Sequence, residues 1–329
     1  MSGTSEIELP VAPAVVWNEL VSAGPRAWYH GLRAEGAFEP GARIRWVGDD
    51  GQSAEESEVL AIEPERRLRL RTRFTFAPRY AEAPEHELEY ALEPAGGGTR
   101  VRLTWSGEGP GVAFLAAEGR YVLPGLRLAA DPAAQAEIAR RERIGPIEIA
   151  DVTPERLGDY QSFFDHDAFR DYPVWAACYC ATPMIDSEED RTPEQNRAEV
   201  SERIDRGELT ALLAYAEGKP VAWCHWGTVT RLAGIKAKFG LDPGEQDGVG
   251  SLACFVVSSP YRGHGLAGRL LEAALDRMRA AGLEFAEGYP LAAGETAQAN
   301  WRGPLEMYLR AGFEPYREAG KWVVVRRRL

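Results

Sequence analysis

Cysteine, long apolar runs and basic residues are all scarce in this sequence, and each shortage excludes a class of protein. The chain has four cysteines, too few and too clustered for a disulfide framework, so we expect reduced thiols. No apolar run approaches the roughly 20 residues that span a bilayer, and residues 1–10 lack the basic start of a signal peptide. Acidic residues outnumber basic ones by 50 to 38, and the net charge of -12 disfavours phosphate backbones and anionic membranes. We therefore expect a cytoplasmic protein without nucleic-acid or membrane partners.

The length and composition are those of an ordinary globular protein with two domains. The 329 residues include 45% hydrophobic and 27% charged residues, and at roughly 100 to 200 residues per domain such a length predicts two cores. The regular patterns weaken near the middle, where Gly119 and Pro124 interrupt short apolar runs and argue against a long helix. We place the boundary there, with domains at 1–132 and 147–329 and a linker at 133–146.

The first half is predicted to be an antiparallel meander with one short helix near its start. Pro13 opens a helix in which Val16 and Trp17 share an apolar face. Two later stretches, 67–73 and 100–105, alternate apolar with polar residues, mostly arginine, as half-buried strands do. Three consecutive glycines before the second stretch predict a hairpin.

The second half is predicted to be mixed α/β. Its patterns give a strand, two helices and two strands, followed by a strand, helix, strand, helix and two strands, beginning at 147–149. Thr192 and Gln195 have the spacing of a capping box at the start of a helix. Gly282 and Gly312 mark the ends of two later helices.

One turn in the second half carries the sharpest chemical signal. A buried strand passes through Arg262-Gly263-His264-Gly265 into a helix, and such a turn brings backbone amides and the positive end of the helix dipole to an anion. A plain structural connection is one interpretation. A dinucleotide fingerprint formed with Gly268 is a second, but a doubly wound domain carries that fingerprint on its first strand. A third interpretation comes from a resemblance.

Two ordered motifs in the second half resemble those of the GNAT acyltransferases. Arg262-x-x-Gly265-x-Ala267 is similar to their pyrophosphate loop, and Tyr308-x-x-x-Gly312-Phe313 is similar to a motif on a later helix. The resemblance covers 147–329 and implies an acetyl-CoA-dependent N-acyltransferase in which an amine attacks the thioester directly. It also implies that acetyl-CoA contacts the strand Phe255, Val256 and Val257 and the turn Arg262, Gly263, His264, Gly265, Leu266 and Ala267.

The same resemblance implies catalytic roles. Tyr308 matches the usual acid, and a phenol with a pKa near 10 is suited to protonating a thiolate. Glu287, on the strand beside the expected divergence of the sheet, is our candidate base, directly or through water. A solvent-facing carboxylate without a role is the alternative. The family often has asparagine seven residues before the tyrosine, where this sequence has Trp301, so the acceptor side is not transferable from other members.

Several other polar and aromatic residues could have either a structural or a functional role. No second cysteine pair accompanies Cys178 and Cys180, and we predict no metal site. His225 is expected to be a strand residue. Both cysteines and four aromatic residues either line the acceptor pocket or pack in the core: Trp175, Tyr179, Trp223 and Trp226.

The first half resembles the START-like helix-grip fold, in its activator-of-heat-shock-ATPase branch. The similarity runs from about Glu6 to Ser106 and includes Val16-Trp17, Trp28-Tyr29 and Gly98-Thr99-Arg100-Val101. It implies an antiparallel sheet curled around a long C-terminal helix, often with an apolar cavity. An apolar ligand and plain core packing remain open for the apolar face that these residues supply: Trp17, Phe38, Leu68, Leu70, Val101, Leu103 and Trp105.

These expectations describe an α+β protein with two domains, a helix-grip antiparallel sheet followed by a mixed α/β GNAT fold. We predict transfer of an acetyl group from acetyl-CoA to an amine of a small molecule or a protein, with an N-terminal domain for ligand binding or docking. The alternative is a non-catalytic, ligand-sensing protein that binds CoA. A nicotinamide oxidoreductase is a distant third reading.

Overall fold

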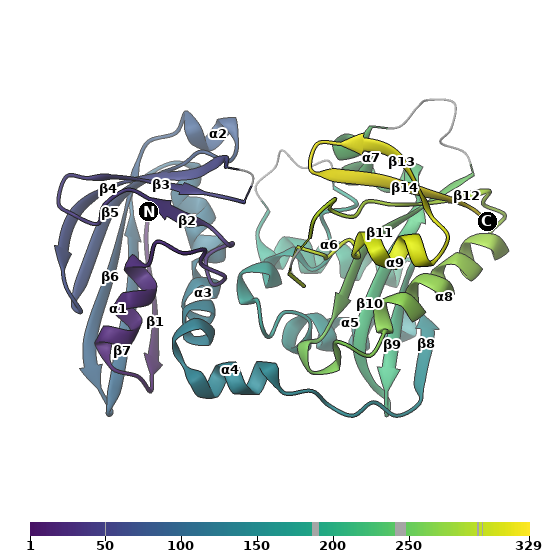
Figure 1. The fold of residues 1–329 in the computed structure, drawn as a ribbon, viewed down its shortest axis with the longest axis horizontal. Helices are drawn as coiled ribbons and strands as arrows, with labels where there is room; N and C mark the ends of the chain where they lie inside the picture. Colours follow the sequence, from purple (N-terminus) through teal and green to yellow (C-terminus); the bar gives the residue numbers. More distant parts are fainter. Residues whose placement is uncertain (50, 186–190, 241–247, 295, 298) are drawn as a thin grey trace. The chain divides into compact units, whose positions relative to one another are not determined.

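The computed structural model describes residues 1–49, 51–185, 191–240, 248–294, 296–297 and 299–329, and it contains two compact units (Figure 1). The first comprises Met1–Ala139 and Asp171–Ala177, and the second comprises Arg140–Arg170 and Cys178–Leu329. Each unit has its own seven-stranded sheet and its own apolar core, which confirms the two-domain α+β class. Within the described residues, no helix combines the length and the apolar character that crossing a bilayer requires.

The sheet of the first unit is entirely antiparallel, in the order β1-β7-β6-β5-β4-β3-β2. Its strands are β1 (Ser2–Leu9), β2 (Arg33–Glu35), β3 (Arg43–Val47), β4 (Ser53–Glu63), β5 (Arg67–Phe74), β6 (His86–Ala95) and β7 (Gly98–Ser106). The predicted meander is confirmed from β2 to β7, and β1 extends it by pairing with β7. The predicted alternation is also confirmed, because Arg69 and Arg71 face solvent and pair with Glu87 and Glu58 of the neighbouring strands.

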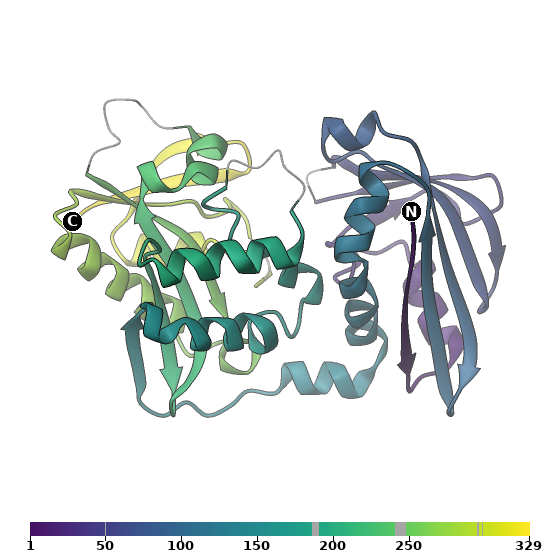
Figure 2. The same cartoon turned by 180° about the vertical axis from the view of Figure 1, so that it is seen from behind.

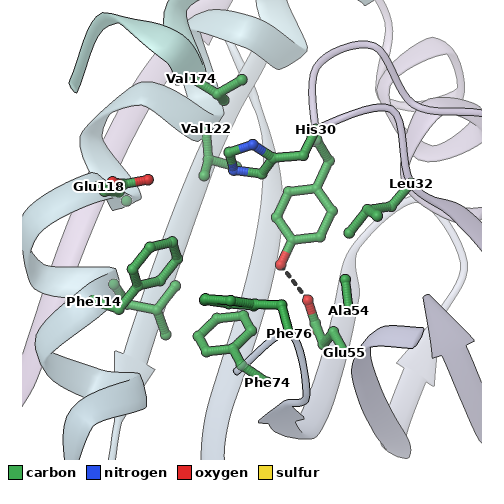
Figure 3. A pocket seen from close by; sticks show the side chains of 13 residues that line it. His30, Leu32, Ala54, Glu55, Phe74, Phe76, Phe114, Glu118, Val122 and Val174 are labelled. Carbon is green, nitrogen blue, oxygen red and sulfur yellow. Dashed lines mark hydrogen bonds between the residues drawn. The ribbon is translucent and has the colours of Figure 1, made fainter. Parts of the chain in front are cut away.

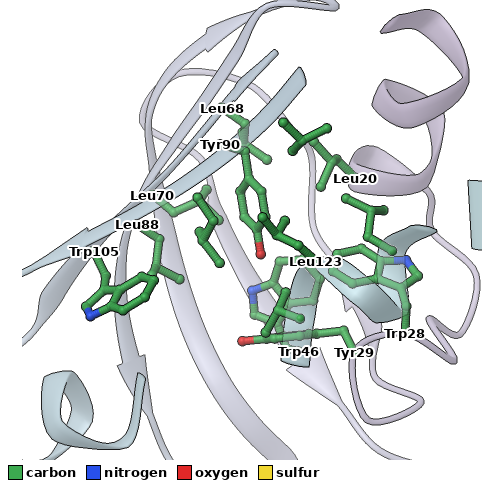
Figure 4. Packing of buried hydrophobic residues seen from close by; sticks show 14 of the residues in the cluster. Leu20, Trp28, Tyr29, Trp46, Leu68, Leu70, Leu88, Tyr90, Trp105 and Leu123 are labelled. Atoms are coloured by element: carbon green, nitrogen blue, oxygen red, sulfur yellow. The ribbon is translucent and has the colours of Figure 1, made fainter. Parts of the chain in front are cut away.

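Among the described residues of this unit, four helices accompany the sheet: α1 (Pro13–Val21), α2 (Pro78–Ala81), α3 (Pro110–Ala130) and α4 (Pro132–Ala139). The prediction for α1 is confirmed, with Val16 and Trp17 buried. Helix α3 packs against β1, β7 and α1, so it lies along the apolar face of the sheet. Figure 4 shows its Leu123 among side chains of the sheet, including Leu70 and Tyr90.

The interruption that we expected around Gly119 and Pro124 is wrong, because α3 runs through both residues without a break. A Cβ on Gly119 would lie 3.1 Å from the ring of Trp105, and one on Gly125 would lie 3.0 Å from the carbonyl oxygen of Trp28. These glycines therefore allow the helix to approach its neighbours closely. Pro124 removes one helical amide, and the burial of the apolar face on either side of it offsets that loss.

The sheet of the second unit has the order β13-β14-β12-β11-β10-β9-β8, and only β11 and β12 are parallel to each other. Its strands are β8 (Ile147–Asp151), β9 (Ala211–Ala216), β10 (Lys219–Thr228), β11 (Val249–Val257), β12 (Phe285–Gly288), β13 (Glu314–Ala319) and β14 (Trp322–Arg328). This confirms the predicted mixed sheet and its strand order along the chain.

Helices cover both faces of this second sheet (Figure 2). They are α5 (Leu157–Ser162), α6 (Pro193–Asp205), α7 (Ala233–Phe239), α8 (Leu266–Ala280) and α9 (Leu305–Arg310). Side chains of α5 and α6 join one core, and those of α8 and α9 join the core on the other face. The capping box at Thr192 and Gln195 is confirmed by reciprocal hydrogen bonds at the start of α6. The short helix α7 is not predicted by the apolar pattern.

Candidate active site

The glycine turn between β11 and α8 is exposed to solvent, and side chains of the turn hold its backbone in place. Gly263 and Gly265 have φ of 81° and 71°, a conformation that side chains with a Cβ rarely adopt. A Cβ at either position would meet no described atom within 4 Å, so backbone conformation rather than crowding favours glycine there. Gly265 is the N-cap of α8, and no described side chain caps this end of the helix. The first amides of α8 thus form an open donor site for an anion.

Two side chains of the predicted phosphate site hold the turn itself. Arg262 donates from Nε to the carbonyl oxygen of Val257 at 2.9 Å. His264 donates from Nδ1 to the carbonyl oxygen of Arg262 at 3.0 Å and lies at the exposed surface. Leu266 is buried and Ala267 is half-buried in the first turn of α8. The structure therefore places residues 262–267 in one turn at a helix start, with Gly263, His264 and Gly265 exposed.

The strand β11 parts from β12 beyond Leu252, where their parallel pairing with Phe285–Gly288 ends. Past this point the amide of Phe255 donates to the carbonyl oxygen of Trp301 at 2.7 Å. Arg302 also approaches β11, with Nη1 3.4 Å from the carbonyl oxygen of Ala253. The edge that we expected to bind the cofactor through Phe255–Val257 is thus partly occupied by residues 301–302 of the same chain. No sequence pattern marks these backbone contacts.

Tyr308 lies on α9 and is completely buried. Its hydroxyl donates to the carbonyl oxygen of Arg302 at 2.7 Å, and its ring meets the ring of Phe255 edge-on at 6.4 Å. The ring also packs on Gly288, where a Cβ would lie only 2.3 Å from it. Burial raises the pKa of Tyr308 well above its usual value, so the phenol keeps its proton.

Glu287 is also completely buried, which makes the solvent-facing alternative wrong. Its carboxylate accepts from Nη2 of Arg326 at 2.6 Å and from the hydroxyl of Tyr289 at 3.1 Å. Successive side chains of a strand point to opposite faces, so Glu287 lies on the other side of β12 from Gly288 and the ring of Tyr308. The two candidate catalytic side chains therefore belong to different faces of the sheet.

A buried guanidinium, which sequence reasoning did not single out, lies beside this site. Arg302 is 2% exposed and stacks on Trp301, with its guanidinium carbon 4.0 Å from the ring centre. Phe239 and Trp322 lie at 5.0 Å and 5.5 Å. Burial lowers the pKa of Arg302 to about 10, so the side chain still carries its charge near neutrality and the aromatic faces stabilise it.

A buried cluster on the other face of the second sheet from Tyr308 contains Cys180, Trp223 and His225. Nε1 of Trp223 donates to Sγ of Cys180 at 3.2 Å, and Nδ1 of His225 lies 3.4 Å from the same sulfur. Burial lowers the pKa of His225 to about 4, so this imidazole is neutral at physiological pH. Trp223 packs on the rings of Tyr160 and Phe164, whereas Trp226 lines a separate cavity. In the part of the chain that the structure describes, no group of three metal-ligating side chains is found.

The first unit contains a cavity of about 320 Å³ (Figure 3). Apolar side chains of the sheet and of α3 form most of its wall, including Phe74, Phe114 and Val122. Glu55 of β4 is the buried acid of this wall, and it accepts a hydrogen bond from the hydroxyl of Tyr29 (dashed line in Figure 3). The first unit is therefore not filled completely by its own core.

Several solved structures resemble part of this chain, at low identity and with low TM-scores. Protein MLL2253 from Mesorhizobium loti is 20% identical over 39% of this chain and 96% of its own, with a TM-score of 0.34. The Aha1 dimer from Colwellia psychrerythraea is 18% identical over 40% of this chain and 97% of its own, with a TM-score of 0.33. The Hsp90 activator PFC0360w from Plasmodium falciparum is 17% identical over 36% and 87%, with a TM-score of 0.30. No curated protein matches the chain.

Two families match separate parts of the sequence. Residues 10–120 match the activator of Hsp90 ATPase homolog 1-like proteins, and residues 174–293 match the acetyltransferase (GNAT) family. The first match lies within the antiparallel sheet and α3, and the second includes the open turn between β11 and α8. The chain therefore joins a domain of the activator-of-Hsp90-ATPase type to a domain of the GNAT acetyltransferase family.

Proposed function

We propose that the protein transfers an acetyl group from acetyl-CoA to an amine on its second unit, while its first unit binds a small ligand. The observation that carries the proposal is the open glycine turn with the uncapped start of α8, lying directly after a strand that parts from its parallel neighbour. This arrangement supplies unpaired amides for a pyrophosphate and a strand edge for an extended cofactor arm. The GNAT family match over 174–293 supports the same conclusion.

The backbone of 263–267 would bind the pyrophosphate, with Arg262 orienting the turn. Beyond Leu252, the Phe255–Val257 edge would receive the arm of the cofactor once the Phe255 amide exchanges its bond to Trp301. These residues bind and orient acetyl-CoA, and they carry out no bond making themselves.

In the transfer step, the amine nitrogen bonds to the thioester carbon and the carbon–sulfur bond breaks. The proton lost by the amine goes to Glu287, directly or through water, and the hydroxyl of Tyr308 gives a proton to the departing sulfur. Both groups must first exchange a partner, because Tyr308 donates to Arg302 and Glu287 accepts from Arg326 and Tyr289. We therefore propose that acetyl-CoA binding displaces residues 301–302 and frees the phenol.

A second candidate function is supported by the same contacts. If the bonds from Phe255 and Tyr308 to residues 301–302 persist with the cofactor bound, the unit binds CoA without turning it over. Calorimetry with acetyl-CoA and with NAD tests the cofactor class, and we expect binding of acetyl-CoA alone. CoA release with a panel of primary amines then separates an enzyme from a binding protein. Saturable acetyl-CoA binding without CoA release for any amine would support the non-catalytic alternative.

For the chain as a whole we propose the limits 1–132 and 147–329, joined by 133–146. Helix α4 apart from Pro132, and the segment after it, fall in this linker, and residues 140–146 form no regular element. Limited proteolysis should cut first within 140–146, and mass spectrometry of the fragments would locate the cuts. Primary cleavage inside either sheet would reject these limits.

A further inference from the structure

The cavity of the first unit is large enough for a small molecule and is lined mainly by apolar side chains. Its volume of about 320 Å³ falls at the lower end of the range typical of ligand pockets. Phe74 and Phe114 form an aromatic wall, with ring centres 5.2 Å apart. Phe76 belongs to the same wall and is 48% exposed. The cavity thus has an aromatic body that a hydrophobic ligand would cover.

One carboxyl group breaks this apolar lining. Glu55 is 1% exposed, whereas the next residue, Glu56, is exposed to solvent. Its two oxygens accept from the hydroxyl of Tyr29 and, at 3.1 Å, from the hydroxyl of Ser57. Ser57 in turn is bonded to Thr72 at 2.9 Å. Every one of these partners is uncharged, so the network solvates the acid without neutralising it.

A buried cation, Arg26, favours the charged form of Glu55, but its effect on the pKa of Glu55 is smaller than that of burial. Arg26 donates from Nη2 to the carbonyl oxygens of Leu20 at 2.9 Å and Ser22 at 2.5 Å, and its guanidinium stacks on Trp46 at 4.4 Å. Among the described residues, none forms an ion pair with Glu55. A buried acid is normally paired with a base, and an unpaired one in a cavity marks a functional site. Burial raises the pKa of Glu55 to about 7. Near neutral pH, a ligand cation beside Glu55 would therefore shift this carboxyl group toward its ionised form.

We propose that this cavity binds a small hydrophobic amine, whose ammonium group pairs with Glu55 while its apolar body lies against Phe74, Phe76 and Phe114. The inference deepens the ligand-binding part of the proposed function and rests on it. An amine is also the class of molecule that the proposed acyl transfer consumes. The first unit would then hold either the acceptor or a compound that resembles it.

The test compares three probes of nearly equal shape on the full chain by calorimetry without acetyl-CoA. The probes are 4-phenylbutylamine, 4-phenylbutan-1-ol and 4-phenylbutanoate. The amine should bind about 10-fold more tightly than the alcohol, because a hydrogen bond to a charged partner is stronger than a neutral one, and the carboxylate should bind most weakly. Equal affinity of the amine and the alcohol in the wild-type chain would overturn the proposal, and so would no binding of either.

Three variants locate the amine. Glu55→Gln keeps acceptor and donor groups for Tyr29 and Ser57, and it should abolish the preference for the amine while the alcohol still binds. Glu118→Gln changes the other acid of the cavity wall and should keep the preference. Ala54→Leu fills the cavity and should weaken both ligands by at least about 10-fold.

The outcomes separate this proposal from the acyl transfer. Amine binding that survives unchanged in both Glu55→Gln and Ala54→Leu would place the amine on the second unit and overturn the inference, while leaving acyl transfer intact. A preference lost in Glu118→Gln and kept in Glu55→Gln would also overturn it. Should Glu55→Gln fail to fold, the wild-type ranking and Ala54→Leu still decide. Binding of acetyl-CoA should be the same in all three variants.

Discussion

The hydroxyl of Tyr308 donates to the backbone carbonyl of Arg302 at 2.7 Å, six residues earlier in the chain. The preceding carbonyl, that of Trp301, accepts from the amide of Phe255 on β11. Two consecutive carbonyls therefore hold the two groups that the proposed mechanism needs, one for the cofactor arm and one for the leaving sulfur. Any ligand that enters beside β11 has to compete with both, so the state of residues 301–302 decides whether the site is open.

Tyr308→Phe removes the hydroxyl and keeps the ring that packs on Gly288 and Phe255. We expect turnover to fall by about 100-fold or more, because proton donation to sulfur is lost. Acetyl-CoA affinity should not fall, because the hydroxyl that is removed only holds the carbonyl of Arg302, a contact that the cofactor has to displace. Steady-state kinetics and calorimetry on the same preparation check this. Full turnover in the variant would mean that the thiolate leaves without this acid.

Gly265→Val places a β-branched side chain at a left-handed N-cap in front of the open amides. Acetyl-CoA binding should be lost in calorimetry while the chain stays folded. Gly282→Val is the matched control, since Gly282 has a φ of 76° directly after α8 and a Cβ there also meets no described atom within 4 Å. The control introduces a similar backbone strain at the opposite end of the helix and should bind acetyl-CoA normally. Equal affinities for the two variants would reject the turn as the phosphate site.

Glu287→Gln separates a base from a structural carboxylate. It removes the carboxylate partner of Arg326, whose side chain is 13% exposed, so urea denaturation should show a loss of about 3 kcal/mol in the free energy of unfolding. If Glu287 accepts the amine proton, turnover of the folded variant should fall by about 100-fold, and by less at high pH, where more of the amine is already free. Normal turnover below the unfolding transition would leave Glu287 with a structural role alone.

The raised pKa of Glu55 makes the stability of the first unit depend on pH. Between the ordinary carboxyl pKa of 4.5 and the folded value of about 7, the unfolded chain has lost a proton that the folded chain retains. The free energy of unfolding should therefore fall as pH rises through this window, by about 3 kcal/mol from this group. Glutamine does not titrate, so the stability of the wild type relative to Glu55→Gln should decrease by that amount from pH 4.5 to 7.5. A difference that stays constant over this range would contradict the assignment.

Regular elements and the open glycine turn could be predicted from the sequence because their signals are local. The alternation along β5 and the capping box of α6 each lie within a few residues, and the turn from Arg262 to Ala267 is contiguous. Its glycines have the open, left-handed geometry that such a turn requires. The roles assigned to Tyr308 and Glu287 stay predictions, since their partners are set by tertiary contacts.

The features that escaped prediction depend on distant partners. Gly119 looks like a helix breaker in the sequence, whereas its lack of a side chain serves a contact with Trp105 on another element. The carbonyls of Trp301 and Arg302 carry no side-chain signature at all. Glu55 had a usable signal, since it shares the inward face of β4 with Ser57 and Val59, but its cavity depends on α3 as well.

The pairing of β1 with β7 affects how the first unit folds during synthesis on the ribosome. Ser2 pairs with Ser106 and Leu9 with Thr99, so β1 has no partner until β7, the last strand of this sheet, has been synthesised. Until then β1 exposes unpaired amides and carbonyls, and α3, which packs on β1, has no complete surface to meet. The antiparallel unit should thus fold late and nearly all at once, when α3 leaves the ribosomal tunnel. A pause in synthesis before that point would expose a nascent chain in need of a chaperone.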